Sequence, residues 1–162
     1  HGTRLISLNT TPGHPNCIKP GKRPRITLTP TLVMKNGLPV MAISVQGGDH
    51  QDQTTLNLIL NVLEFGLTPE EAVSVARFAT NLHEDSFNPA PDRKSVIAKQ
   101  RLLSLNPGID TSVIRELEKR GHKIDITEEV IGSPVMLFFN EKSGTWTGAT
   151  DPNIPHYTGA LK

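Results

Sequence analysis

The sequence predicts a mixed α/β fold in which a mainly antiparallel sheet is covered by helices. Two observations support this class. Segments rich in apolar and β-branched residues are joined by hairpin turns at Asn36-Gly37 and near Gly144, and only a few helical segments separate them. Hairpins join antiparallel neighbours, whereas a parallel doubly wound sheet needs a helical crossover between successive strands. The 162 residues fit a single domain spanning 1–162.

The first elements of the fold lie between residues 4 and 45. A short strand is expected at 4–8. The prolines and glycines of residues 9–30 predict a long ordered loop, because proline fixes φ and removes a backbone donor. Residues 31–35 and 39–45 predict a hairpin around Asn36-Gly37, a pair that tolerates the positive φ angles of a tight turn.

Two helices are expected next. The first should bury the apolar residues spaced i, i+3, i+4 and i+7, which are Leu56, Ile59, Leu60 and Leu63. Gly66 suits the position after its last turn. The second helix should begin at Thr68, which forms a capping box with Glu71, and run to about Phe78.

The C-terminal half should contain one more helix and several strands. A loop is expected at 80–94, a short strand at 95–98 and a helix at 110–120. That helix should turn Val113, Ile114 and Leu117 toward the core. Strands are expected at 123–127, 135–139 and 145–150, and irregular structure from Asp151 onward.

Composition excludes several classes of function. A net charge of +1 and 4% aromatic residues give no support for binding nucleic acid or an anionic membrane. No apolar run reaches about 18 residues, so no membrane span is expected. Cys17 is the single cysteine, and the six histidines show no metal-ligand spacing, so neither a disulfide, a metal nor a cofactor is expected.

Gly47-Gly48 is the candidate site, because it lies between an apolar strand and a helix. Glycines in such a bend let backbone N–H groups point at a developing oxyanion or at a phosphate. The alternative is a strand-to-helix turn that only needs unusual backbone angles. No Lys-Ser/Thr pair follows, which excludes a P-loop. Asp49 lies beside the glycines and is a weaker candidate for contact with a ligand.

Several stretches, in order along nearly the whole chain, resemble the γ-glutamyltranspeptidase family, specifically the C-terminal part of its small subunit and its acylase-like branch. The stretches are Pro20-Gly21-Lys22-Arg23-Pro24, Thr27, Thr29-Pro30-Thr31-Leu32-Val33, Lys35-Asn36-Gly37, Gly47-Gly48, Ala76-Arg77-Phe78 and Gly148-Ala149-Thr150-Asp151-Pro152.

The resemblance implies an N-terminal-nucleophile hydrolase fold, a four-layer αββα sandwich. Such enzymes cleave themselves into a large and a small subunit, and the new N-terminal Thr attacks a γ-glutamyl or related amide. Gly47 and Gly48 match the oxyanion hole of the family. Thr27 matches one of two hydroxyl residues that hold the glutamyl α-carboxylate, and Ile26 stands at the other position.

Two departures leave room for another acyl group. Ile26 cannot hydrogen-bond, and Thr3 and Arg4 stand near the region where typical members have an acidic pair. The nucleophilic Thr also lies upstream of the proline-rich loop in the family, whereas this chain begins at His1 without an initiator Met. We therefore expect a processed or truncated piece, with a cloning boundary as the alternative.

The expected function is that of part of a γ-glutamyltransferase or glutathione hydrolase-like enzyme, inactive as this chain alone because the nucleophile segment is missing. Its expected partners are the large subunit, the rest of the small subunit and a small acyl amide. The alternative is a non-catalytic degenerate domain that binds a small acid or a partner chain. No export signal is visible, and both an exported (periplasmic or extracellular) and a cytoplasmic location stay open.

Overall fold

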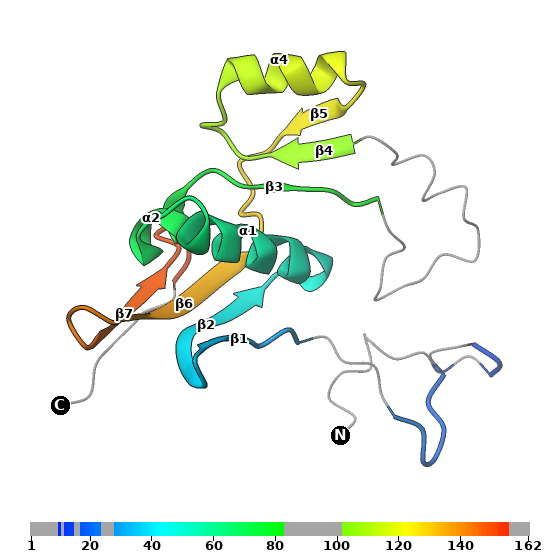
Figure 1. Cartoon of the computed structure of the whole chain (residues 1–162). Coiled ribbons are helices and arrows are strands. Elements are labelled where there is room, and N and C mark those ends of the chain that lie inside the picture. The colour runs from blue at the N-terminus through cyan, green and yellow to red at the C-terminus, as the bar shows by residue number, and fades with distance from the viewer. Residues whose placement is uncertain (1–9, 11, 15–16, 24–27, 83–101, 156–162) are drawn as a thin grey trace.

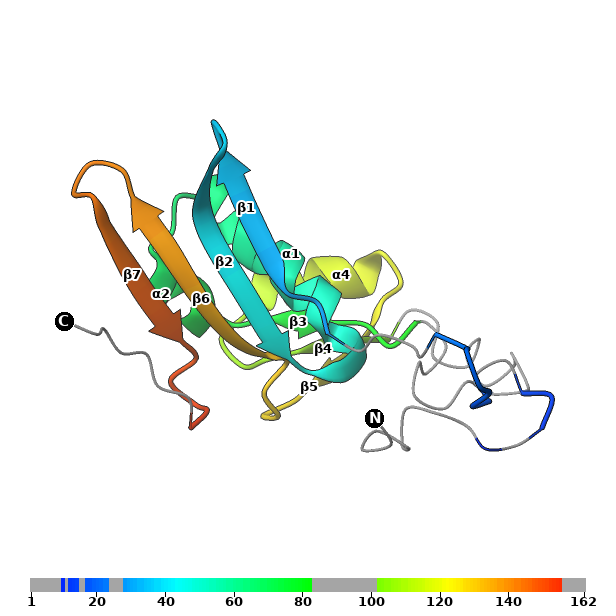
Figure 2. The same ribbon diagram turned by 90° about the horizontal axis from the view of Figure 1, so that it is seen from below.

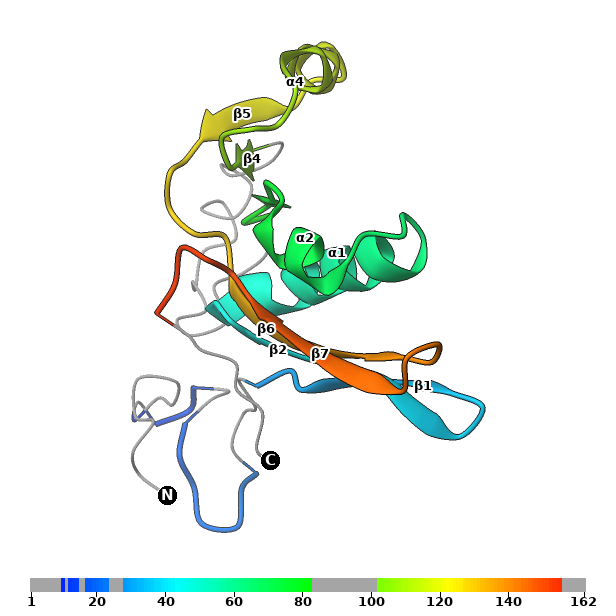
Figure 3. The same ribbon diagram turned by 90° about the vertical axis from the view of Figure 1, so that its left-hand side faces the viewer.

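The computed structural model describes residues 10, 12–14, 17–23, 28–82 and 102–155. Its main feature is a four-stranded antiparallel sheet in the order β1-β2-β6-β7, seen from below in Figure 2. Two helices, α1 and α2, lie on one face of this sheet (Figures 1 and 3). These elements are β1 (Thr31–Lys35), β2 (Leu38–Gln46), α1 (Gln51–Leu63), α2 (Pro69–Ser74), β6 (Ser133–Asn140) and β7 (Thr145–Thr150).

The β1–β2 hairpin forms as the sequence predicts. Asn36 and Gly37 occupy the turn with φ angles of 51° and 80°, which asparagine and glycine adopt at the least cost. β2 then runs three residues further than β1 can pair, and ends at Gln46. The hairpin therefore delivers the chain to Gly47 at the end of a central strand.

The core lies between this sheet and the two helices. Successive side chains of a strand point to opposite faces, so alternate residues of β2, β6 and β7 meet the helices. The buried cluster consists of Met41, Ile43, Val45, Met136 and Ala149 from the sheet, with Leu58, Val62, Ala72 and Val73 from the helices.

The predicted buried face of α1 is correct only in part. Ile59 packs against the core, but Leu56 and Leu63 are 56% and 48% exposed. The buried residues of this helix are Gln51, Thr54, Thr55, Leu58 and Val62. The helix carries two apolar stripes, and tertiary packing selects the one whose small threonines allow close approach to the sheet and to Gly132.

The start of α2 is confirmed and its predicted end is wrong. Thr68 and Glu71 form both hydrogen bonds of a capping box, and Gly66 has a φ of 70°. The helix ends at Ser74, because Val75 already has an extended backbone, with ψ at 150°. This early end turns the chain so that Arg77 reaches the interior.

A second, three-stranded sheet joins β3 (Phe78–Ala79), β4 (Leu102–Leu105) and β5 (Lys123–Ile126). Neither β3 nor β4 is predicted from the sequence, because β3 has only two residues and the Leu-Leu-Ser-Leu run of β4 does not alternate regularly between apolar and polar residues. β4 and β5 are parallel, an exception to the predicted antiparallel pairing. The connection between them contains α4 (Thr111–Lys119), which lies over β5 in Figure 1.

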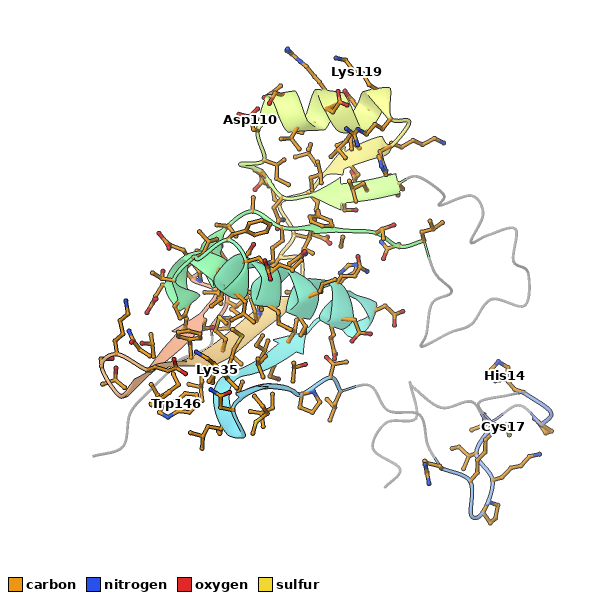
Figure 4. The ribbon with its side chains drawn as sticks, in the orientation of Figure 1. His14, Cys17, Lys35, Asp110, Lys119 and Trp146 are labelled. Atoms are coloured by element: carbon orange, nitrogen blue, oxygen red, sulfur yellow. The ribbon has the colours of Figure 1, made fainter. Side chains whose placement is uncertain are left out.

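α4 forms where expected but buries less than expected. Asp110 accepts a hydrogen bond from the N–H of Ser112 at the start of the helix, and Figure 4 shows Asp110 and Lys119 at its opposite ends. Ile114 and Leu117 are half-buried. Val113 is 48% exposed, so its predicted place in the core is wrong. The three-stranded sheet is too narrow to cover the full apolar stripe of the helix.

The face of the four-stranded sheet that points away from α1 and α2 is apolar. Strand register places Leu32, Ala42, Leu137 and Gly148 in one row across all four strands. Leu32 and Leu137 are 58% and 47% exposed. Nothing within the described ranges forms a helix or strand over this face (Figures 2 and 3).

Of the remaining predicted segments, the strands at 4–8 and 95–98 lie outside the described residues, as does most of the loop at 80–94. The described residues between 10 and 30 form no helix. Cys17 is buried there, and Figure 4 shows it with His14, apart from the sheet.

Candidate functional site

The Gly47-Gly48 dipeptide lies at a sharp bend between β2 and the helical layer. A short 3₁₀ turn, η2 (Gly48–His50), begins directly after Gly47 and leads into α1 without a break. Gly48 has a φ of 54°, in the left-handed region that glycine adopts most readily. Both glycines are half-buried, so the dipeptide is neither sealed in the core nor fully in bulk water.

The helix that follows the bend favours negative charge near the glycines. The first N–H groups of a helix have no partner within it, and its aligned peptide dipoles leave a partial positive charge at that end. The Gly47-Gly48 bend therefore combines a backbone conformation that glycine adopts readily with a local field suited to an oxyanion.

Gly132 backs the dipeptide from behind. A Cβ placed on Gly47 would come 3.0 Å from the Cα of Gly132. Gly132 is buried, and a Cβ on it would come 2.5 Å from Oγ1 of Thr54. A side chain on Gly47 would push the two backbone segments apart, whereas one on Gly132 would collide with the side chains of Thr54 and Val45. Close packing therefore accounts for the need for glycine at both places.

Side chains at the start of α1 fasten neighbouring segments to the bend. Gln53 exchanges two hydrogen bonds with the backbone of Thr80: the Thr80 N–H donates to Oε1, and Nε2 donates to the Thr80 carbonyl, both at 2.9 Å. Nε2 of His50 lies 3.1 Å from Oδ1 of Asn81. These contacts hold residues 80–81 beside the bend.

The predicted substrate-binding residues are only partly described. Asp49 is half-buried directly after Gly48, and its backbone carbonyl accepts a hydrogen bond from Nε2 of Gln53 at 3.4 Å. Thr27 and Ile26 lie outside the described residues. Thr29, two positions further along, donates a hydrogen bond to Oε1 of Gln51 at 2.9 Å, which links the end of the proline-rich loop to α1.

A buried ion pair near the bend was missed by sequence reasoning. Nη2 of Arg77 contacts Oδ2 of Asp151, and the two side chains are 5% and 2% exposed. Each residue belongs to a stretch that resembles the family, but 74 positions separate them. The signal available in the sequence was a single arginine with apolar residues on both sides. An arginine in such a setting is a candidate for burial, and a buried guanidinium requires a partner.

The acidic groups with perturbed pKa values lie elsewhere. Backbone and side-chain hydrogen bonds from Thr68 lower the pKa of Glu71, and those from Ser112 lower the pKa of Asp110. The described residues contain no cluster of histidine, cysteine and acidic side chains able to hold a metal ion. None of the described helices is both long and apolar enough to span a membrane.

The fold is that of N-terminal-nucleophile hydrolases. γ-Glutamyltranspeptidase from Pseudomonas nitroreducens matches with a TM-score of 0.73 at 19% identity, over 99% of this chain and 80% of that one. The family model of γ-glutamyltranspeptidase matches residues 3–159. The chain therefore belongs to the γ-glutamyltranspeptidase family.

Two relatives from the genus Bacillus have a higher sequence identity to this chain than the Pseudomonas nitroreducens enzyme has. The chain is 38% identical to the glutathione hydrolase-like YwrD proenzyme of Bacillus subtilis, over 86% of this chain and 25% of the relative. The structure of cephalosporin acylase from Bacillus halodurans matches at 26% identity with a TM-score of 0.70, over 90% of this chain and 24% of that one. The chain spans between 16% and 22% of the length of three glutathione hydrolase proenzymes that it matches.

Proposed function

We propose that this chain supplies the oxyanion hole and part of the acyl pocket of a γ-glutamyltransferase or glutathione hydrolase-like enzyme. The nucleophile is an N-terminal Thr carried outside these residues. Its hydroxyl oxygen attacks the carbonyl carbon of a γ-glutamyl or related amide while its own α-amine takes the hydroxyl proton. That proton then passes to the substrate nitrogen as the C–N bond breaks, so the amine half of the substrate departs and the acyl group stays on the Thr oxygen as an ester. The resulting acyl-enzyme passes its acyl group to water or to an acceptor amine. In this proposal the chain alone is inactive.

The observation that supports this role is the placement of Gly47-Gly48. The dipeptide is half-buried at the head of α1 and is held from behind by Gly132. A tetrahedral intermediate places a full negative charge on the former carbonyl oxygen. Two backbone N–H groups held rigidly at such a point stabilise that charge, and losing one donor typically costs about 3 kcal/mol of the barrier reduction.

The proposal also concerns which acyl group the enzyme accepts and which residues contact it. Thr27 and Asp49 contact it, with Thr27 reaching the end opposite the scissile amide. Ile26 offers no hydrogen bond to an α-carboxylate, and Thr3 and Arg4 offer no carboxylate to an α-amine. These residues leave room for an acyl group other than γ-glutamyl. Relatives of this chain include proteins named acylases as well as glutathione hydrolases.

The partners in this proposal are the large subunit and the remaining part of the small subunit. The apolar face that no described helix or strand covers supports them. Contiguous exposed apolar surface on a protein commonly marks an interaction site. A second sheet packed on that face completes the αββα sandwich of the family, with Leu32 and Leu137 at the interface between the two sheets.

The test is to express the complete reading frame that encodes this chain. The proposal predicts self-cleavage at a Thr upstream of His1, followed by hydrolysis or transfer of acyl amides. Comparing a γ-glutamyl amide with amides of other acyl groups measures the preference. A precursor that stays uncleaved and transfers no acyl group would contradict the proposal and favour the alternative, a degenerate domain that binds a small acid or a partner chain.

A further inference from the structure

The Arg77–Asp151 ion pair occupies a central place behind the glycine bend. Arg77 lies between α2 and β3, and Asp151 follows the last residue of β7. Both side chains are almost completely buried. A buried pair must recover the loss of hydration of two charges, and it does so only when further hydrogen bonds satisfy both groups.

The guanidinium of Arg77 makes those further hydrogen bonds with backbone carbonyls. Nη1 donates to the carbonyl of Val73 at 2.7 Å, Nε to that of Ile131 at 2.8 Å, and Nη2 to that of Gly132 at 3.4 Å. A planar guanidinium holds several acceptors at fixed angles, which a lysine ammonium cannot do. Arg77 therefore ties the end of α2 and the segment 131–132 to β7.

Gly132 transmits this constraint to Gly47. The two backbones are in such close contact that a Cβ on Gly47 would come 3.0 Å from the Cα of Gly132. On its other sides Gly132 meets Thr54 and Val45, to which an added Cβ would come within 2.5 Å and 3.1 Å. Closely packed segments transmit small displacements. A shift of segment 131–132 must therefore displace Gly47.

We infer that Arg77 and Asp151 are positioning residues, which fix the direction of the Gly47 and Gly48 amides through Gly132. This inference rests on the proposed oxyanion role of the two glycines. Neither side chain contacts the dipeptide directly, so their effect on the reaction is exerted through the backbone. If the pair served stability alone, conservative substitutions would lower the unfolding midpoint without moving those amides.

Two variants test the charge of Asp151 and the backbone hydrogen bonds of Arg77 separately. Asp151→Asn removes the negative charge but keeps an acceptor for Arg77. Arg77→Lys keeps the positive charge beside Asp151 but cannot bond the carbonyls of Ile131 and Gly132 together. Glu141→Gln is the matched control, because it neutralises the exposed Lys35–Glu141 ion pair. Lys35 lies at the turn end of the sheet, away from the bend (Figure 4).

The measurement is amide NMR of the full chain, with hydrogen exchange. Both test variants should shift the Gly47, Gly48 and Gly132 resonances and raise their exchange rates at least about tenfold, while Glu141→Gln leaves them unchanged. In protein expressed from the complete reading frame, Arg77→Lys should lower kcat about tenfold or more, with KM within about twofold, because an oxyanion hole acts on the transition state.

The outcomes distinguish the inference from the proposed function. A folded Arg77→Lys variant whose glycine amides keep their resonances and exchange rates overturns the positioning role. Shifted amides with unchanged kcat support the positioning role and contradict the oxyanion function. If neither variant folds, hydrogen exchange in the unsubstituted chain tests the positioning role instead. The amides of Gly47 and Gly132 should then open in one step with the Nε–H of Arg77, and separate openings would overturn the inference.

Discussion

Thr29 donates a hydrogen bond from its hydroxyl to Oε1 of Gln51, at 2.9 Å. The bond joins the end of the proline-rich loop to the first residue of α1, across 22 positions of sequence. Gln51 is buried and follows directly on η2. Thr29 and the segment that follows the Gly47-Gly48 bend are thus linked at one point.

Replacing Thr29 with valine should measure this link. The side chain keeps its shape and loses one partly buried hydrogen bond, so the free energy of unfolding should fall by about 1 kcal/mol. Thr145→Val is the control, since the Thr145 hydroxyl contacts Ser143 only at the exposed surface and should cost much less. Urea unfolding of both variants makes the comparison. Equal losses would show that the Thr29–Gln51 bond adds nothing.

The close packing of Gly132 predicts a large cost for an added methyl group. Gly132 and Gly144 have nearly equal φ angles of 66° and 68°, but only Gly132 has neighbours within 4 Å of an added Cβ. Gly144→Ala should cost about 1 kcal/mol through backbone strain alone. Gly132→Ala should cost about 2 kcal/mol more, because it also overpacks the contact with Thr54.

Thermal or urea unfolding of the two alanine variants tests this difference. Similar losses of stability at Gly132 and Gly144 would mean that segment 131–132 can move away freely. That result would also remove the mechanical link between Arg77 and Gly47.

The capping box of α2 predicts a pH dependence of stability. Hydrogen bonds from Thr68 lower the pKa of Glu71 below its ordinary value of 4.5. A group with a lowered folded-state pKa stabilises the fold above its unfolded pKa and loses that contribution as the pH falls through the folded pKa. Glu71→Gln should therefore destabilise the protein at neutral pH, and the difference from the parent chain should shrink below the ordinary pKa.

Urea midpoints at neutral and acidic pH provide this test. Glu70→Gln is the control in the same first turn, outside the capping box. If the difference between parent and Glu71→Gln stays constant as the pH falls from 7 to about 3, the carboxylate form of Glu71 does not stabilise this cap.

Substitutions on the apolar outer face of the sheet should affect subunit association more than they affect the stability of the isolated chain. Leu137 and Val113 are almost equally exposed, at 47% and 48%. In the isolated chain, changing either to serine should alter stability by less than about 0.5 kcal/mol. In protein made from the complete reading frame, only Leu137→Ser should weaken the association with the large subunit, because Val113 lies on α4.

Size-exclusion chromatography of the complete protein checks this contrast. Co-elution of the two subunits should be reduced for Leu137→Ser and kept for Val113→Ser. Normal co-elution of both variants would place the partner on another face.

Local chemistry in the sequence predicts the parts of the fold that local interactions decide. Asn36-Gly37 forms its hairpin turn, and the Thr68 capping box forms both hydrogen bonds. The packed face of α1 depends on partners far along the chain. Thr54 has a polar side chain and yet is fully buried, packed so closely against Gly132 that a Cβ on that glycine would come 2.5 Å from Oγ1 of Thr54.

The candidate site could be predicted only where the local sequence defines it. Gly47-Gly48 is visible as a bend between a strand and a helix, and the structure places it there. The residues behind it were not predictable individually. Arg77 lies in the middle of the described chain and Asp151 near its end, 74 positions further along, and no periodicity or spacing rule connects them.

The most direct test of the central proposal is a crystal structure of the processed enzyme, made from the complete reading frame, with a boronate adduct on its nucleophilic Thr. The boronate oxygen mimics the oxyanion of the tetrahedral intermediate. We expect that oxygen to lie about 2.7–3.1 Å from the backbone nitrogen of Gly47, Gly48 or both. An adduct whose oxygen is bound by other donors, with both glycine amides turned away from it, would contradict the proposed role of this chain.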